Sequence, residues 1–160
     1  MTPKDKRREL IFQLKENLEL LTLSRKVLDY SYEKCRKINL DKGCTAQKLE
    51  SFEALTSRFA RTSDILTQKL IKTLFLITQD IPKTFIDAAN MLEKMEIIKK
   101  ADIILDIRQL RNEIAHEYAL RDINTIFKDV FKHVPLLFDI IDDVERYVNQ
   151  LIKEKWPLKI

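Results

Sequence analysis

This 160-residue chain contains a single glycine, Gly43. Glycine supplies the positive backbone φ angles of tight hairpin turns, and it lets the backbone of a phosphate-binding loop approach its ligand closely. A chain with one glycine cannot build a sheet of many hairpins, a P-loop or the glycine-rich fingerprint of a dinucleotide-binding fold. The shortage of glycine therefore argues against an all-β fold and excludes P-loop and Rossmann chemistry.

Apolar residues recur at intervals of three, four and seven almost everywhere, which is the spacing of one face of an α-helix. No stretch shows the two-residue alternation of apolar and polar residues that is typical of a strand, so we expect an all-α fold. Thr2 and Pro3 suit the N-cap and the first position of a helix, and Thr45 suits the N-cap of a second one. The apolar positions are Leu10, Leu14, Leu18, Leu21 and Leu28 in the first helix and Phe52, Leu55, Phe59, Leu66, Leu70, Leu74 and Ile77 in the second.

Breaks in the apolar spacing predict about five helices. The first two are separated by residues 41–44, which contain the glycine, and the second ends at residues 79–82, where a proline follows. Three further helices are expected at about residues 84–92, 101–118 and 122–152, the last of them capped by Asp122.

Pro135 falls inside the closing helix. Proline lacks a backbone N–H and crowds the carbonyl four residues before it, so we expect a kink there. The sequence shows no internal repeat, no low-complexity segment and no linker. We therefore predict a single domain over residues 1–160, an up-down bundle of about five helices with a kinked closing helix.

The composition is that of a globular domain, with 45% hydrophobic and 34% charged residues. No apolar run reaches the roughly 18 residues of a membrane span, and no signal-peptide pattern opens the chain, so we expect a cytoplasmic protein without a membrane partner. Two cysteines and two histidines are too few for a disulfide framework or a metal cluster, and we expect no metal and no other cofactor. The net charge of +4 allows nucleic-acid binding without requiring it.

Residues 108–118 place a distinctive set of side chains at the end of an otherwise apolar helix: Arg108, Arg111, Asn112, His116 and Tyr118. An imidazole can accept or donate a proton at neutral pH. A guanidinium can hold a phosphate through two parallel N–H donors and stabilise the charge that builds on it. Because RNA carries its own nucleophile, the 2′-hydroxyl, these groups could cleave RNA without a metal ion.

Helix geometry limits what this segment presents. Arg111 and His116 are five residues apart and lie roughly 140° apart around an ideal helix, whereas Asn112 and His116, four apart, can touch. Bringing Arg111 and His116 together requires the helix end to unwind, or a second copy of the chain to line the same cleft. The plainer alternative is that His116 is a structural histidine near the core and Tyr118 an amphipathic core residue.

The eight residues from Arg111 to Tyr118, Arg-Asn-Glu-Ile-Ala-His-Glu-Tyr, resemble the signature of the HEPN superfamily. That signature is an Arg, a polar residue that is often Asn, three more residues and then His. The trailing tyrosine completes Arg-x4-His-x-Tyr, which resembles the HepT toxin branch of the MNT–HEPN toxin–antitoxin systems. The position of the segment, at the end of a penultimate helix before one long closing helix, is similar to that in the family domain.

The resemblance implies a HEPN helical bundle that acts as a homodimer, with both signatures facing a shared cleft. Arg111 and His116 would be the catalytic pair of a metal-independent endoribonuclease, and Asn112 would orient His116 or bind phosphate. The partner would be an MNT-type nucleotidyltransferase antitoxin, which in this branch can silence the toxin by adding AMP to the tyrosine that matches Tyr118. A bulky anion at that position would repel RNA from the cleft.

Other readings stay open beside this one. Arg58, Arg61 and Arg108 are candidate RNA contacts, but Arg58 and Arg61 also fit a solvated helix face on which Arg61 pairs with Asp64. The chain could also be a non-catalytic helical subunit that binds a nucleotidyltransferase or its substrate. A third reading is a helical interaction module in which Arg111 and His116 are merely structural.

Overall fold

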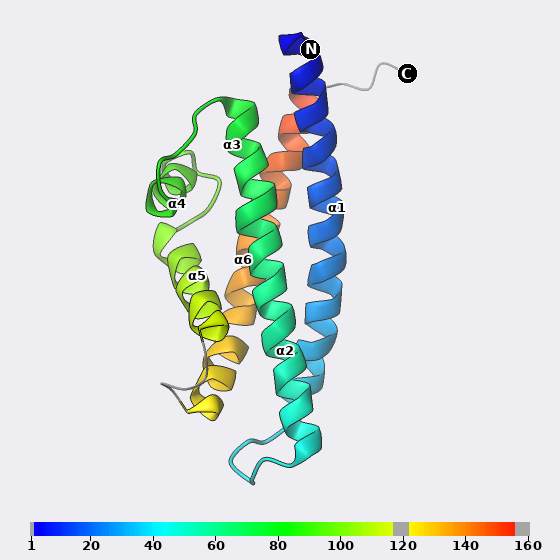
Figure 1. Ribbon diagram of the computed structural model, residues 1–160, viewed down its shortest axis with the longest axis vertical. Helices are drawn as coiled ribbons and strands as arrows, with labels where there is room; N and C mark the ends of the chain where they lie inside the picture. The colour runs from blue at the N-terminus through cyan, green and yellow to red at the C-terminus, as the bar shows by residue number, and fades with distance from the viewer. Residues whose placement is uncertain (1, 117–121, 156–160) are drawn as a thin grey trace.

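The described residues of the computed structural model, 2–116 and 122–155, fold into a bundle of helices (Figure 1). Helix accounts for 84% of the structure and no strand occurs among these residues, which confirms the all-α prediction. The elements are α1 (Pro3–Arg36), α2 (Ala46–Asp64), the π-helical segment η1 (Ile65–Ile71), α3 (Lys72–Thr78), α4 (Phe85–Lys94), α5 (Ala101–Ala115) and α6 (Ile123–Lys155).

The long helices alternate in direction (Figure 1). Helix α1 descends along one side of the bundle, and α2, η1 and α3 return beside it as one continuous rod. The short α4 lies at the side, α5 descends from it, and α6 rises behind the others so that its end lies near the start of α1. Helix α6 contacts α1, α2 and α5, which makes it the element around which the bundle closes.

The helix starts follow from local capping. The Thr2 hydroxyl accepts a hydrogen bond from the Asp5 amide and the Asp5 carboxylate accepts one from the Thr2 amide, a reciprocal capping box. The Thr2 hydroxyl and the Thr2 amide both donate to the Asp5 carboxylate and lower the pKa of Asp5. Thr45 caps α2, and Asp122 accepts from the amide of Asn124 at the start of α6, as the sequence predicts. Gly43 has a φ angle of 89° in the connection between α1 and α2, a conformation that favours glycine.

The second helix departs from its prediction, because its middle is a π-helix rather than an α-helix. Just before and within η1, the Thr67 hydroxyl donates to the Ser63 carbonyl at 2.8 Å, the acceptor that an α-helix would offer to the Thr67 amide. Side-chain competition for backbone acceptors favours irregular turns. The wider turn changes which side chains face outward after Asp64, and π-helical turns occur often at functional sites.

The core lies between α1, the α2–α3 rod, α5 and α6. The Phe52 and Phe127 rings stack with their centroids 5.2 Å apart, and the predicted apolar positions Leu14, Leu21, Phe59 and Leu66 are buried completely or nearly so. Burial of this kind supplies most of the stability of a helical bundle. Leu10 and Leu18 are only partly buried at its edge.

Pro135 lies inside α6, which continues through it to Lys155. The expected kink there stays a prediction. No helix in the described parts of the chain is long and apolar enough to cross a membrane.

Candidate functional site

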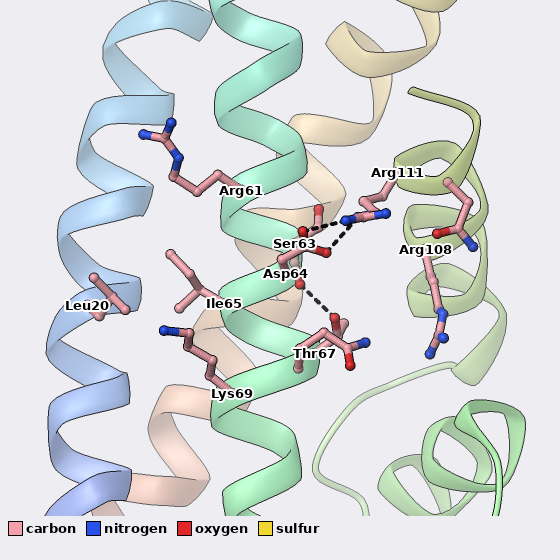
Figure 2. Close-up of a pocket in the computed structure, with 11 residues that line it drawn as sticks. Leu20, Arg61, Ser63, Asp64, Ile65, Thr67, Lys69, Arg108 and Arg111 are labelled. Carbon is pink, nitrogen blue, oxygen red and sulfur yellow. Dashed lines mark hydrogen bonds and ion pairs between the residues drawn. The ribbon is translucent and has the colours of Figure 1, made fainter. Parts of the chain in front are cut away.

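Arg111, near the end of α5, forms an ion pair with Asp64, the last residue of α2 (Figure 2). The Arg111 Nε donates to Asp64 Oδ1 at 2.6 Å, and Nη2 donates to Oδ2 at 2.7 Å. About a third of each side chain remains exposed. The hydrogen bonds to Asp64 raise the pKa of the Arg111 guanidinium above its ordinary value, so the group stays charged.

The pair leaves one edge of the Arg111 guanidinium free. A guanidinium carries five N–H donors, and Asp64 takes the one on Nε and one on Nη2. Nη1 takes part in none of the hydrogen bonds of the described residues. The terminal edge of Arg111, formed by Nη1 and Nη2, can therefore bind an oxyanion through two parallel bonds while Asp64 holds the other edge.

Around this pair lies a groove of about 630 Å³, which we call the arginine groove. Its lining includes four cationic side chains, Arg61, Lys69, Arg108 and Arg111, and a single carboxylate, that of Asp64. Figure 2 shows Arg108 and Arg111 on the side of α5, and Arg61 and Lys69 on the opposite side of the α2–η1 rod, toward α1. The excess of positive charge suits an extended anion rather than a neutral ligand.

A second groove, of about 670 Å³, lies between α4 and α5, and we call it the α4–α5 groove. His116 lines it, immediately after the end of α5, where its amide donates to the Asn112 carbonyl at 3.0 Å and its side chain is exposed. Phe85 and Ile86, the first residues of α4, line the other side. Arg108 and Asn112 line both grooves and so form the ridge between them.

The two proposed catalytic side chains therefore face different grooves of one chain. Arg111 lines the arginine groove and His116 the α4–α5 groove, as the angular separation on an ideal helix predicts. Asn112 sits between them. The helix ends at Ala115 rather than near residue 118, and Tyr118 lies outside the described residues.

The three candidate RNA contacts fall in different surroundings. Arg58 points to α1, where its Nη1 donates to the Ser31 hydroxyl at 2.6 Å and to the Val27 carbonyl at 3.4 Å, so its guanidinium ties two helices together. Arg61 is exposed and lines the arginine groove. Asp64, the partner that the sequence suggests for Arg61, accepts from Arg111 through both oxygens, and Figure 2 shows Arg61 pointing away from it toward α1. Arg108 is half-buried on the ridge.

Sequence reasoning missed Asp64 as the partner of Arg111, and it missed Phe85 altogether. Asp64 precedes Arg111 by 47 residues, and only the packing of α2 against α5 brings the two together. Phe85 read as one more apolar residue of a short helix. In the structure the guanidinium carbon of Arg108 lies 4.2 Å from the centroid of its ring.

The fold and the site define the class: an all-helical bundle with an arginine-lined groove at the joint of α2, η1 and α5. Within residues 2–116 and 122–155, no group of three or more His, Cys, Asp or Glu side chains is arranged to hold a metal ion. No protein-family model matches the chain, and no curated protein and no solved structure is significantly similar to it.

Proposed function

We propose that this chain is a metal-independent endoribonuclease of the HEPN type, in which Arg111 and His116 act on the RNA phosphodiester. The observation that carries the proposal is the guanidinium of Arg111, which Asp64 holds by one edge while the other edge is free in a cationic groove. A guanidinium positioned in this way binds a phosphate and stabilises the charge that builds on it in the transition state.

The proposed reaction uses only groups of the RNA and of this chain. The 2′-hydroxyl oxygen attacks the adjacent phosphorus and the bond from phosphorus to the 5′-oxygen breaks, leaving a 2′,3′-cyclic phosphate and a 5′-hydroxyl. The imidazole of His116 accepts the 2′-hydroxyl proton as the bond to phosphorus forms, and the resulting imidazolium donates a proton to the departing 5′-oxygen, so the count of protons is unchanged. Arg111 stays protonated throughout and acts by charge and position.

The proposal includes a homodimer, because Arg111 and His116 face different grooves of one chain. In a two-fold dimer the same surface of both copies can line one cleft, so the arginine of one copy can work beside the histidine of the other. Mixing Arg111→Ala chains with His116→Ala chains tests this arrangement. Partial recovery of activity in the mixture supports a shared cleft, and no recovery from a mixture shown to form heterodimers contradicts it.

RNA cleavage in the presence of EDTA tests the activity itself. We expect the wild-type chain to produce fragments with 5′-hydroxyl ends, and Arg111→Ala and His116→Ala to lose about 100-fold or more of the rate. Arg146→Ala, on the exposed side of α6, is the matched control and should keep full activity. Equal cleavage by all four proteins would point to a contaminating nuclease and overturn the proposal.

As the partner we propose an MNT-type nucleotidyltransferase that silences the toxin by adding AMP to Tyr118. Induction of the chain alone should arrest growth, the His116→Ala chain should not at matched soluble expression, and co-expression of the partner should restore growth. Tyr118→Phe should escape the partner while it keeps the arrest. Arrest that is equal for wild type and His116→Ala would contradict a toxic activity at this site.

One observation favours a second candidate function, that of a non-catalytic binding subunit. Helix α1 carries exposed apolar side chains on successive turns, where Leu23, Val27 and Tyr30 are 64%, 45% and 68% exposed. Contiguous exposed apolar side chains mark protein interfaces. This candidate predicts a tight complex with the nucleotidyltransferase, weakened by Leu23→Ser, and no RNA cleavage under any condition.

A further inference from the structure

Phe85 and Arg108 form a stacked pair at the head of the α4–α5 groove. The Phe85 ring is half-buried against the core, and the capping box of Thr84 and Asp87 fixes the start of α4 that carries it. The Arg108 guanidinium carbon lies over the ring at 4.2 Å from its centroid. This cation–π contact holds the guanidinium against the ring and restrains the side chain.

The chemistry of the groove fits a flat, neutral group better than an anion. Phe85, Ile86 and Leu105 give it apolar walls, and Ile86 is 59% exposed on its rim. Gln109 and Asn112 add amide groups, and the carboxylate of Glu113, which accepts from Gln109 Nε2 at 3.3 Å, also lines the groove and disfavours an anion there. A volume of about 670 Å³ lies in the usual range for small-molecule pockets and is large enough for one nucleoside.

We propose that the α4–α5 groove is a nucleobase subsite in which an unpaired RNA base stacks on the Arg108 guanidinium, beside His116. Bases stack well on arginine planes, and RNA-binding proteins recognise unpaired bases by such stacking together with hydrogen bonds to base edges. This inference rests on the proposed function and names its substrate class, single-stranded RNA.

The ridge between the two grooves connects the proposed base subsite with the proposed site of cleavage. Arg108 and Asn112 line both grooves, so a strand that crosses the ridge places a base in the α4–α5 groove and a phosphate in the arginine groove. Asn112 and Gln109 line the same groove, and their amides can pair with a base edge. A base held there sits next to the imidazole proposed to move the proton.

The test uses a short single-stranded oligouridylate that is 2′-O-methylated, and therefore cannot be cleaved, and that carries one 2-aminopurine. The fluorescence of 2-aminopurine falls when the base stacks. A second oligonucleotide of the same length has an abasic site in place of the 2-aminopurine. Both oligonucleotides carry fluorescein at the 5′ end, and their binding is followed by the anisotropy of this label for wild type, Arg108→Lys, Phe85→Leu and Phe85→Tyr. Arg146→Lys is the matched control for loss of a guanidinium.

We expect Arg108→Lys and Phe85→Leu to raise the Kd for the base-containing oligonucleotide about tenfold and to abolish the quenching, because stacking of one base is lost. Binding of the abasic oligonucleotide should change little, since lysine keeps the charge. Phe85→Tyr keeps the ring and should retain quenching, which separates loss of stacking from loss of folding. Arg146→Lys should leave both values unchanged.

Two outcomes would overturn the inference. The first is wild-type binding that is equal for the two oligonucleotides. The second is variants that weaken binding of both oligonucleotides alike, which would make Arg108 a phosphate contact. The readout needs no cleavage: quenching without cleavage of unmodified RNA leaves the subsite standing and contradicts the ribonuclease, whereas cleavage without quenching does the reverse.

Discussion

Two bidentate Arg–Asp pairs join distant helices of this bundle, and they differ in the edge of the guanidinium that they use. Arg25 of α1 donates to Asp142 of α6 through both terminal nitrogens, Nη1 and Nη2. Arg111 of α5 donates to Asp64 of α2 through Nε and Nη2. The two pairs do not differ in how exposed the arginine is, because the side chains of Arg25 and Arg111 are 29% and 32% exposed.

The edge of the guanidinium that the aspartate occupies decides whether the arginine can also bind a second anion. The terminal edge of Arg25 is taken by Asp142, and its guanidinium lies 4.9 Å from the centroid of the Phe138 ring, so the pair ties α1 to α6. Among the described residues none takes the terminal edge of Arg111, which lines a cationic groove. The same kind of ion pair thus ties two helices together in one place, and in the proposed ribonuclease the other pair has Asp64 as the positioning residue for Arg111.

Replacing each arginine by lysine should separate the two pairs most widely. Lysine keeps the charge but cannot hold a carboxylate and a phosphate with two planar edges. Arg111→Lys should therefore lose about 100-fold of the rate of RNA cleavage, whereas Arg25→Lys should retain the wild-type rate. Initial rates in EDTA, with circular dichroism as the check on folding, make the measurement. Equal rates for Arg111→Lys and Arg25→Lys would contradict the proposed functional difference between the two pairs.

Changing the carboxylates tests positioning directly. Asp64→Asn keeps the shape but weakens the hold on Arg111, and we expect kcat to fall about tenfold or more with little change in KM. Asp142→Asn should change neither constant. A rise in kcat for Asp64→Asn would mean that Asp64 restrains the site rather than orienting it, and recovery by Asp64→Glu would support positioning.

The same two asparagine variants should have small and similar effects on stability. Both pairs are partly exposed, and pairs of this kind contribute about 1 kcal/mol or less. Urea unfolding should therefore show a decrease of about that size in the free energy of unfolding for each variant, although only Asp64→Asn impairs cleavage. A much larger loss for Asp64→Asn alone would assign its effect on activity to unfolding.

A pH scan gives the smallest effect and the control for the others. Guanidinium groups stay protonated, and the pKa of Arg111 is raised further by Asp64, so the stability differences of the two variants should persist at alkaline pH.

Burial raises the pKa of the Cys35 thiol from its ordinary 9.0 to about 11. The folded protein thus favours the neutral thiol, and its contribution to stability, complete below pH 9, is lost as the pH rises toward 11.

Cys35→Ala should remove that part of the slope, measured by urea unfolding at several alkaline pH values. Cys44, which is exposed, serves as the control: Cys44→Ala should leave the slope unchanged. An unchanged slope in Cys35→Ala would mean that other groups cause the alkaline loss.

Part of the site could be predicted from the sequence because it depends on the spacing of residues along one helix. The helical spacing places Arg111 and His116 on different faces of α5, and the structure puts them in different grooves. The π-helical turn at Ile65–Ile71 could not be anticipated, because the apolar spacing of the second helix reads as continuous. Hydroxyl bonds to the carbonyl four residues back do not predict it either, because Thr56, Thr62 and Ser63 make the same bond within the regular helix α2.

The sequence by itself determined the all-α fold, the helix starts at Thr2, Thr45 and Asp122, and the buried stripes. These features depend on interactions between residues at most a few positions apart, which the order of residues states directly. Only the tertiary structure decided that Asp64 holds Arg111 and that Phe85 lies under Arg108. Such partners are selected by how whole helices pack against each other, and many surface residues of the right type compete for the same role until the packing is known.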